Sequence, residues 1–473
     1  ERYVMTGTTS TKRERRQKKT SNIERFAPSP YSLKEAAEHA DILSWISVII
    51  FGFGTFVRKQ FIKGILFLLC EAVLFGFLFT TGAEYLPKIL TLGTKKQGKI
   101  KVNGFWRYTA GDNSVEILLY SVMAIAAVIV LIYLATLSLR SAYKAQAITA
   151  SGQKPVNFIK DASSLLDSKA HIGLMTLPTA GIVLFTILPL IFMISMAFTS
   201  YDRNHPVLFT WTGLNNFFAI GNAKSSINAA TFFDVLLWTL IWAFFATFLN
   251  FFFGMFIAMI INRKSTRLKG LWRTCFSLTI AVPQFVSLLV MNNMLQRNGA
   301  INSILLENHW IAQPLPFFQD VTWARVTVIL INLWVGIPFT IMQITGILQN
   351  VPAELYEAAE LDGASWWQRF MNVTMPYIIF VMTPYLITTF TGNINNFNVI
   401  YLLSGGEPTP LDSSAGKTDL LITWLYKLTV DRGDYNIGAV IGIMTFIVLA
   451  VVALVTYRNS GCCLLYTSLM ARG

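Results

Sequence analysis

The sequence predicts an all-α polytopic membrane protein with about eight transmembrane helices, on the evidence of its composition and its long apolar stretches. Hydrophobic residues make up 54% of the 473 residues, charged residues make up 13%, and the mean hydropathy is +0.52. A globular chain ordinarily carries about 25% charged residues, so this one has too few to cover a water-soluble core. A set of soluble domains, a disordered scaffold and a disulfide-rich secreted domain are therefore excluded.

Eight stretches are long and apolar enough to cross a bilayer, which takes about 20 residues for about 30 Å of hydrocarbon. They cover 61–82, 116–138, 172–198, 232–262, 274–296, 323–348, 374–397 and 436–457. A ninth stretch, 42–57, is shorter, contains two glycines and ends at Arg58-Lys59. We expect this stretch to be a re-entrant or interfacial segment beside the first span.

The distribution of Lys and Arg predicts a cytoplasmic N-terminus, because cytoplasmic loops of membrane proteins are enriched in these residues. The basic run Lys12 to Lys19 and the cluster from Arg263 to Arg273 then face the cytoplasm. The net charge of +13 therefore marks these loops and does not indicate a nucleic-acid binder. One loop conflicts, because residues 83–115 would face outward and yet carry Lys88, Lys95, Lys96, Lys99, Lys101 and Arg107.

The chain divides into four parts on these patterns. They are a basic cytosolic tail at 1–40, a re-entrant segment with two spans at 41–170, a six-span core at 171–458, and a tail at 461–473. The last part reads as a translated sequencing adaptor and not as native protein. Cys70 and Cys275 stand alone in apolar surroundings, and the four His residues show no metal-ligand spacing, so we expect no metal site.

The most informative segment, 351–376, lies between the sixth and seventh spans. Val351 to Gly363 predicts a short helix with proline in its first turn, acids near its positive end and glycine as its stop. Ser365 and Gln368 have the capping-box spacing that starts a second short helix. Judged by physical chemistry alone, a solvated amphipathic loop is the commoner explanation of such a segment.

The same segment resembles the EAA loop of ABC importer permeases, the coupling helix that sits in a groove of the ATPase subunit. Glu357-Ala-Ala is followed after three residues by Gly363, and after nine more by Val373 and then Met375-Pro376, where the family usually has Ile-x-Leu-Pro. The resemblance covers about 172–458 and implies a type I ABC importer permease core preceded by two extra spans. It implies these ATPase-coupling residues: Glu357, Ala358, Ala359, Gly363 and Pro376.

This resemblance also implies the partners and the location of the chain. It predicts a second, shorter permease subunit as heterodimer partner, an ABC ATPase dimer that holds ATP and Mg, and a bacterial cell membrane as the location. The chain itself would bind no cofactor and catalyse no reaction.

Two further stretches are similar to the larger membrane subunit of maltose/maltodextrin importers. They are Leu333-Trp-Val-Gly-Ile-Pro-Phe339 and the run from Asn393 to Pro408. Only about thirty residues separate the third and fourth spans, which resembles the Gram-positive type, whose solute-binding protein is an extracellular lipoprotein. Maltodextrin is therefore the expected oligosaccharide, with another sugar or glycoside as the alternative.

The resemblance implies a sugar site in the middle of the membrane. Its residues, carried over by position, are Gly336, Phe339, Thr389, Gly392, Asn393 and Asn396. Two of them depart from the family, since Gly392 replaces a sugar-stacking aromatic residue and Phe339 replaces a tyrosine, which suggests a roomier site. Asn393 and Asn396 have a second reading as hydrogen-bonding glue between helices, which is worth about 0.6 kcal/mol on average in membranes.

Two other classes of protein remain as alternatives. A secondary transporter needs ionisable groups at membrane depth, and Glu71 is the one acid well inside a predicted span. A membrane-embedded enzyme needs a convergent carboxylate or His cluster, and the sequence shows none. Gly416-Lys417-Thr418 mimics the end of a phosphate-binding loop, but Leu411 stands where the first glycine belongs, so we read it as chance.

Overall fold

The computed structural model describes residues 31–102, 104–155, 163, 170–220, 227–263 and 265–459. The basic run at Lys12 to Lys19 and the adaptor-like tail lie outside the described residues. The chain forms two compact units, Glu1–Phe192 and Met193–Gly473. The second unit thus begins inside the third span, whereas the predicted six-span core begins before that span, at residue 171.

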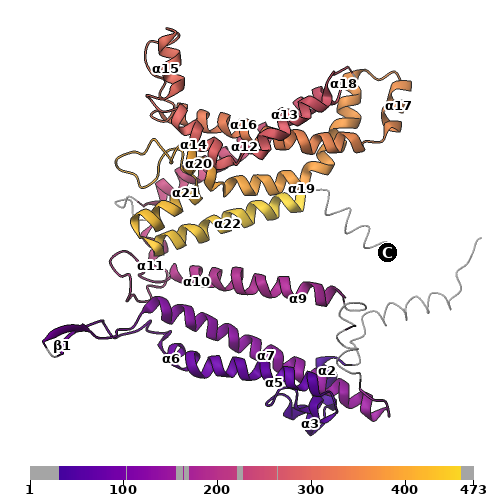
Figure 1. The fold of residues 1–473 in the computed structure, drawn as a ribbon, viewed down its shortest axis with the longest axis vertical. Coiled ribbons are helices and arrows are strands. Elements are labelled where there is room, and N and C mark those ends of the chain that lie inside the picture. The colour runs from indigo at the N-terminus through magenta and orange to yellow at the C-terminus, as the bar shows by residue number, and fades with distance from the viewer. Residues whose placement is uncertain are drawn as a thin grey trace, which may run out of the picture. The chain divides into compact units, whose positions relative to one another are not determined.

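The regular secondary structure of the described residues is helical apart from one β-hairpin and one isolated β-bridge (Figure 1). Seven helical stretches and one bent helix pair are long and apolar enough to cross a membrane. The seven are Phe61–Lys88, Ser114–Ala150, Gly173–Met196, Ala229–Asn262, Val321–Asn350, Trp366–Ile394 and Tyr435–Val455, and the pair is Lys269–Ala281 with Gln284–Met294. Each overlaps a predicted span, so the expected all-α fold with about eight spans is confirmed.

The first unit contains two complete spans and a group of short helices. Its elements are α2 (Leu33–His39), α3 (Ile42–Ile46), α4 (Phe53–Val57), α5 (Phe61–Phe77), η1 (Leu78–Gly82), α6 (Ala83–Tyr85), η2 (Leu86–Lys88), β1 (Lys99–Val102), β2 (Phe105–Tyr108), α7 (Ser114–Ala150), α9 (Ala170–Ile182) and η3 (Val183–Ile187). α10 (Leu188–Met196) completes the third span across the boundary between the units.

The only acid well inside a predicted span has a structural partner in this unit. Glu71 on α5 is 7% exposed, and its Oε2 accepts a hydrogen bond of 2.7 Å from the backbone N–H of Phe51. The next N–H, that of Gly52, donates to Ser138 Oγ on α7 at 2.8 Å. These side chains satisfy the backbone of the turn between α3 and α4, as a buried turn requires. Neither short helix is long enough to span, and the re-entrant placement of 42–57 stays a prediction.

The second unit contains the remaining spans and the loops between them. Its elements are α11 (Asn215–Ala219), α12 (Ala229–Asn262), α13 (Lys269–Ala281), α14 (Gln284–Met294), α15 (Ala300–Glu307), α16 (Val321–Asn350), α17 (Ala353–Leu361), α18 (Trp366–Arg369), η4 (Phe370–Thr374), α19 (Met375–Ile394), α20 (Phe397–Leu403), α21 (Leu421–Tyr426), η5 (Lys427–Arg432) and α22 (Tyr435–Asn459). α12 lies against both α16 and α19 over much of its length.

Two buried hydrophobic clusters lie along α12. Cluster A contains Trp238 and Trp242 of α12 together with residues of α14, α16 and α20, among them Leu288. Cluster B contains Phe251 to Ile261 of α12 together with residues of α16 and α19. The stretch of α12 between the two clusters therefore has a buried hydrophobic cluster before it and another after it along the helix.

The fifth span is not straight, which corrects the prediction of one continuous span at 274–296. α13 and α14 meet at an angle of 85° at Val282 and Pro283. Proline has no backbone N–H and disfavours helical geometry in the residue before it, and Val282 is accordingly extended (φ −75°, ψ 125°). The pair still crosses from one cluster to the other, because Phe276 packs against cluster B and Leu295 belongs to cluster A.

Candidate functional site

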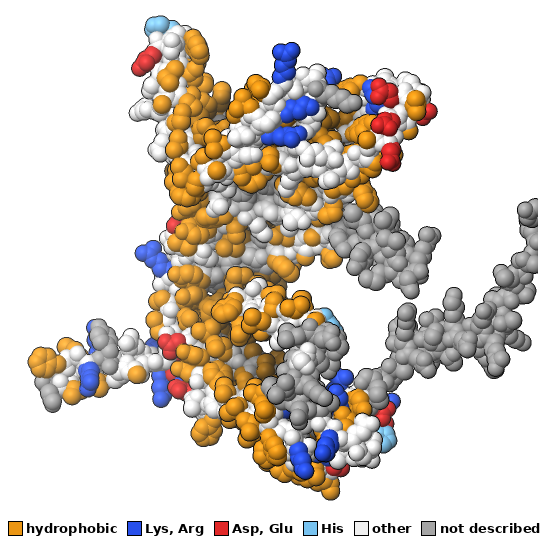
Figure 2. Space-filling model, turned by 45° about the vertical axis from the view of Figure 1, so that its right-hand side comes forward, with side chains coloured by type: hydrophobic (Ala, Val, Ile, Leu, Met, Phe, Trp, Pro, Cys, Tyr) orange, Lys and Arg blue, Asp and Glu red, His pale blue; other side chains and the backbone are white. Residues whose placement is uncertain are grey.

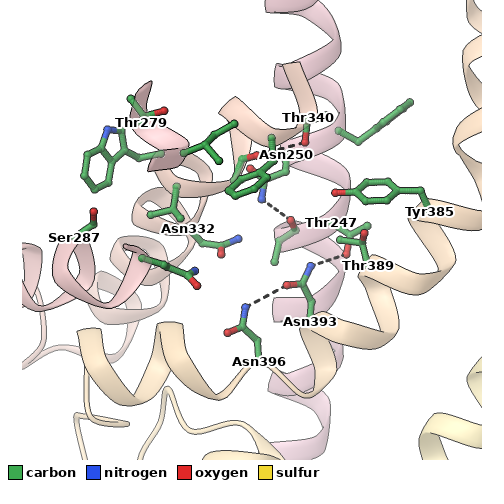
Figure 3. A pocket seen from close by; sticks show the side chains of 18 of the residues that line it. Thr247, Asn250, Thr279, Ser287, Asn332, Thr340, Tyr385, Thr389, Asn393 and Asn396 are labelled. Carbon is green, nitrogen blue, oxygen red and sulfur yellow. Dashed lines mark hydrogen bonds between the residues drawn. The ribbon is translucent and has the colours of Figure 1, made fainter. Parts of the chain in front are cut away.

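A cavity of about 460 Å³ opens within the second unit, beside the stretch of α12 that lies between clusters A and B (Figure 3). Four elements contribute its walls: α12, the bend between α13 and α14, α16 and α19. Its polar side chains are Thr247, Asn250, Thr279, Gln284, Ser287, Asn332, Thr340, Tyr385, Thr389, Asn393 and Asn396. Thr279, Gln284 and Ser287 lie in the wall on the two sides of the bend at Pro283.

The lining is polar but uncharged. None of the described residues around this cavity is Asp, Glu, Lys, Arg or His. Amide and hydroxyl groups offer both donors and acceptors, and the aromatic rings of Trp334, Phe339 and Tyr385 offer apolar faces. Trp334 and Phe339 are each 48% exposed. The arrangement suits a neutral ligand rich in hydroxyl groups with an apolar side to its rings.

Five of the six residues expected at a sugar site lie in this lining. They are Gly336, Phe339, Thr389, Asn393 and Asn396. Gly392 is not among them: it lies on an exposed part of α19, and a Cβ placed there would meet nothing within 4 Å. The expectation that Gly392 lines the cavity is therefore not met, although Thr389 and Asn393 on the same helix do line it.

Asn393 and Asn396 also hold the helices together. Asn393 Nδ2 donates to Thr247 Oγ1 on α12 at 3.0 Å, and its Oδ1 accepts from Asn396 Nδ2 at 3.3 Å. Asn396 Oδ1 in turn accepts from the N–H of Val399 and caps α20. Each amide can form further hydrogen bonds, since an amide group has two donor hydrogens and two acceptor lone pairs. Asn393 and Asn396 therefore form hydrogen bonds within the protein and also line the cavity.

The missing side chain of Gly336 leaves room for the side chain of Asn250 on α12. A Cβ at this position would lie 2.7 Å from both Nδ2 and Oδ1 of Asn250 on α12. One turn further along, the roles reverse, because a Cβ on Gly254 of α12 would lie 2.5 Å from Cβ of Thr340 on α16. Each helix thus presents one glycine and one polar side chain four residues apart. Small residues of this kind let membrane helices approach closely.

Asn250 lines the cavity, although it was not among the site residues predicted from the sequence. Its Nδ2 donates to the carbonyl of Ala246 in its own helix at 2.7 Å, while its buried Oδ1 has no hydrogen-bond partner among the described atoms. Asn332 on α16 was also missed, and it is 6% exposed in the cavity wall. Both are amides at membrane depth, where polar side chains are costly and mark function. The sequence already contains this signal, because both asparagines lie inside predicted apolar spans.

The segment expected to couple to an ATPase forms two short helices joined at a glycine. α17 ends at Leu361, and Gly363 follows with φ +72°, a left-handed conformation that favours glycine. Ser365 Oγ accepts from Gln368 N at 3.3 Å and Gln368 Oε1 accepts from Ser365 N at 2.8 Å, which is the predicted capping box. Pro376 lies in the first turn of α19.

α17 presents its predicted coupling residues outward. Glu357 and Ala358 are exposed, Ala359 is partly so, and Leu361 is 89% exposed. Acidic side chains gather on this end of the second unit (Figure 2). Tyr356 faces the other way, and its hydroxyl lies 2.9 Å from Thr374 Oγ1, which fixes α17 to the start of the seventh span.

Comparison with known proteins defines the class. Residues 250–460 match the family described as "Binding-protein-dependent transport system inner membrane component". The match contains most of the cavity lining, α17 and the four spans from α13 to α22, while Ala246 and Thr247 of the lining precede it. The chain belongs to this family, whose members are multi-pass, non-catalytic membrane subunits of ABC importers without a bound cofactor.

Individual relatives match over nearly the whole chain. The galactooligosaccharides transport system permease protein GanP of Bacillus subtilis is 34% identical over 89% of this chain and 98% of its own length. The maltodextrin permeases MdxF of B. subtilis (91% of this chain, 97% of its own length) and MalC of Streptococcus pneumoniae (90% and 96%) are 31% and 32% identical. A crystal structure of a bacterial ABC transporter involved in the import of the acidic polysaccharide alginate has the same fold, with a TM-score of 0.53 at 20% identity, over 64% of this chain and 98% of that one.

Proposed function

We propose that this chain forms half of the translocation pathway of an ATP-driven importer for neutral oligosaccharides. The observation that carries the proposal is the uncharged cavity between clusters A and B, whose walls combine amides, hydroxyls and aromatic rings. A sugar ring offers hydroxyl groups at its edge and C–H groups on its faces, so it matches this lining on both counts. A charged substrate would find no described counter-charge there.

Asn393, Asn396 and Thr389 are the proposed hydrogen-bonding residues for the sugar. All three lie on the cavity side of the α19–α20 region, and the two amides keep unused donors and acceptors. Phe339 supplies an exposed ring on which the sugar packs. Gly336 contributes by making room, since its missing side chain allows Asn250 and the cavity wall their present positions.

Among oligosaccharides, we propose maltodextrins first and galactooligosaccharides second. The relatives named for these two substrate classes are similar to this chain to nearly the same degree, at 31–32% and 34% identity. The two glycans differ in linkage and in the orientation of one hydroxyl, and both are neutral. The chemistry of the cavity fits either, so the choice between them belongs to experiment.

The proposed importer requires partner subunits. We propose that a second, shorter permease forms the other half of the pathway and that an ATPase dimer binds α17. An extracellular solute-binding lipoprotein would deliver the sugar. ATP-driven closure of the ATPase dimer would move α17, which is tied through Tyr356 to the seventh span. The spans would then rock and pass the sugar inward, with the N-terminus of this chain in the cytoplasm.

The test is uptake by the complete importer reconstituted in proteoliposomes. We expect Asn393→Ala to lower the uptake of radiolabelled maltodextrin about tenfold, the equivalent of one or two lost hydrogen bonds, with assembly unchanged. The matched control is Asn395→Ala, since Asn395 is exposed on the same turn and does not line the cavity. Competition by unlabelled galactooligosaccharide decides the substrate, and equal uptake by wild type and Asn393→Ala contradicts the site.

A further inference from the structure

The cavity in the second unit has two ends, one next to each hydrophobic cluster. Asn393 and Asn396 lie at the end next to cluster A, because their neighbours Ile394 and Val399 belong to that cluster. Tyr385 lies at the other end, since it lines the cavity and also packs against cluster B. Tyr385 and Asn393 are both on α19, and the helical rise separates them by about 12 Å along its axis. The lining therefore extends over more than one sugar ring.

Tyr385 carries a hydroxyl group that points into the cavity. Tyr385, Thr389 and Asn393 follow one another at four-residue intervals, so they lie on one face of α19. In Figure 3 the ring of Tyr385 extends from this face into the cavity, with its hydroxyl directed toward α12. The residue is partly buried, and its hydroxyl forms no hydrogen bond with the described part of the chain. A phenol offers a donor, an acceptor and an apolar ring face to a ligand.

Asn250 on α12 presents a second polar group near the same end. It lies one turn closer to cluster B than Thr247, and the next residue, Phe251, is part of that cluster. The hydrogen bond of its Nδ2 to the carbonyl of Ala246 leaves one amide hydrogen over. Its Oδ1 is buried and has no partner among the described atoms. A buried acceptor without a partner costs free energy, so a ligand hydroxyl that donates to it is favoured.

The chemistry of this end suits a sugar ring better than an ion or a hydrocarbon. None of the described residues around the cavity carries a charge, so an ion would find no counter-charge. A hydrocarbon would leave the hydroxyl of Tyr385 and the amide of Asn250 without partners. A sugar ring provides hydroxyl groups that both donate and accept hydrogen bonds, and C–H groups that pack on the tyrosine ring.

We infer that Tyr385 and Asn250 form a second sugar subsite, which binds a further ring of the oligosaccharide at the cluster B end of the cavity. This inference deepens the proposed function and rests on it. The first rings bind at the cluster A end, where Asn332, Asn393 and Asn396 place three amides in the wall. A disaccharide is held there, whereas a tetrasaccharide reaches both ends. Tyr385 and Asn250 therefore set how strongly the importer favours longer chains.

The experiment compares the uptake of maltose and maltotetraose, both below saturation, by the complete importer in proteoliposomes. Tyr385→Phe removes only the hydroxyl and keeps the ring that packs against cluster B, and Asn250→Ala tests the amide of α12. We expect the ratio of maltotetraose uptake to maltose uptake to fall about fivefold in each variant, the equivalent of one lost hydrogen bond. If galactooligosaccharides are the substrate, the di- and tetrasaccharides of that series take their place.

The matched control is Tyr377→Phe, on the same helix but outside the cavity lining. The hydroxyl of Tyr377 donates to the carbonyl of Asn350 at 3.3 Å, so the control also loses one hydrogen bond, and we expect it to keep the wild-type ratio. An unchanged ratio in either test variant overturns the inference, as does an equal loss of both sugars or an equal fall in the control. If wild type takes up neither kind of oligosaccharide, it is the proposed function that fails.

Discussion

At the scale of single residues, two glycines decide how the cavity wall is built. Gly336 and Gly254 sit four residues from Thr340 and Asn250 respectively, and each glycine accepts the polar side chain of the other helix. The resemblance to sugar permeases pointed to Gly336 as a site residue, and the structure adds the reason that nothing larger fits. Its contact with Asn250 connects residues 86 positions apart, which no local pattern reveals.

We predict that Gly336→Ala disturbs the cavity and that a second change restores it. The added Cβ would lie 2.7 Å from the amide of Asn250 and force it aside, at a cost of about 1–3 kcal/mol typical of overpacking. Asn250→Ala removes the obstructing amide together with its unpartnered Oδ1, so the double variant should be more stable than Gly336→Ala alone.

The measurement is thermal unfolding of the purified complex, with sugar uptake as the functional readout. Gly346→Ala is the matched control, since a Cβ at this glycine of the same helix meets nothing within 4 Å. A Gly336→Ala protein as stable as the control, or a double variant no better than Gly336→Ala, would contradict the packing argument.

At the scale of elements, α17 and the bent pair α13–α14 are the parts to which we assign a role in coupling and in the cavity wall. α17 is held at Tyr356 and, through Glu360, by Arg369 at 3.3 Å, while its Glu357–Ala358 face stays exposed. An exposed helix that is held in its middle and near its C-terminal end can transmit a movement of a bound partner to the seventh span. The bend at Pro283 turns a span into a wall of the cavity.

We predict that Glu357→Arg or Gly363→Val separates this chain from its ATPase. Charge reversal places an unfavourable cation in the proposed groove, and valine at φ +72° costs about 1–2 kcal/mol and shifts the end of α17. The measurement is co-purification of the ATPase and ATP-driven uptake. Glu307→Arg on α15, another exposed acid of the second unit, is the control, and undiminished association in both test variants defeats the coupling assignment.

At the scale of the whole molecule, the order of spans fixes which loops share a side of the membrane. If the bent pair α13–α14 is one crossing, one crossing precedes the β1–β2 hairpin and six precede α17, so we expect these two segments on opposite sides of the membrane. The sequence alone left this open, since its most basic outer loop contradicted the orientation that the other loops indicated.

We predict that the hairpin is accessible from outside intact cells and that α17 is not. Lys96→Cys and Glu354→Cys, each in a variant whose native cysteines are replaced by serine, are treated with a membrane-impermeant maleimide. Label on residue 96 before lysis and on residue 354 only after lysis is the expected result. The reverse pattern, or label on both before lysis, would show that the number of crossings or the orientation is wrong.

The sequence by itself determined the class of protein, the approximate position of the spans and the two short helices of the segment 351–376. Those features are local: apolar length decides a span, and Ser365 with Gln368 decides a helix start within four residues. Only the tertiary structure decided that Glu71 binds the backbone of Phe51, that Asn250 occupies the space left by Gly336, and that Gly392 stays outside the cavity. These outcomes depend on how distant helices pack, and close packing is set by the shapes of both partners at once.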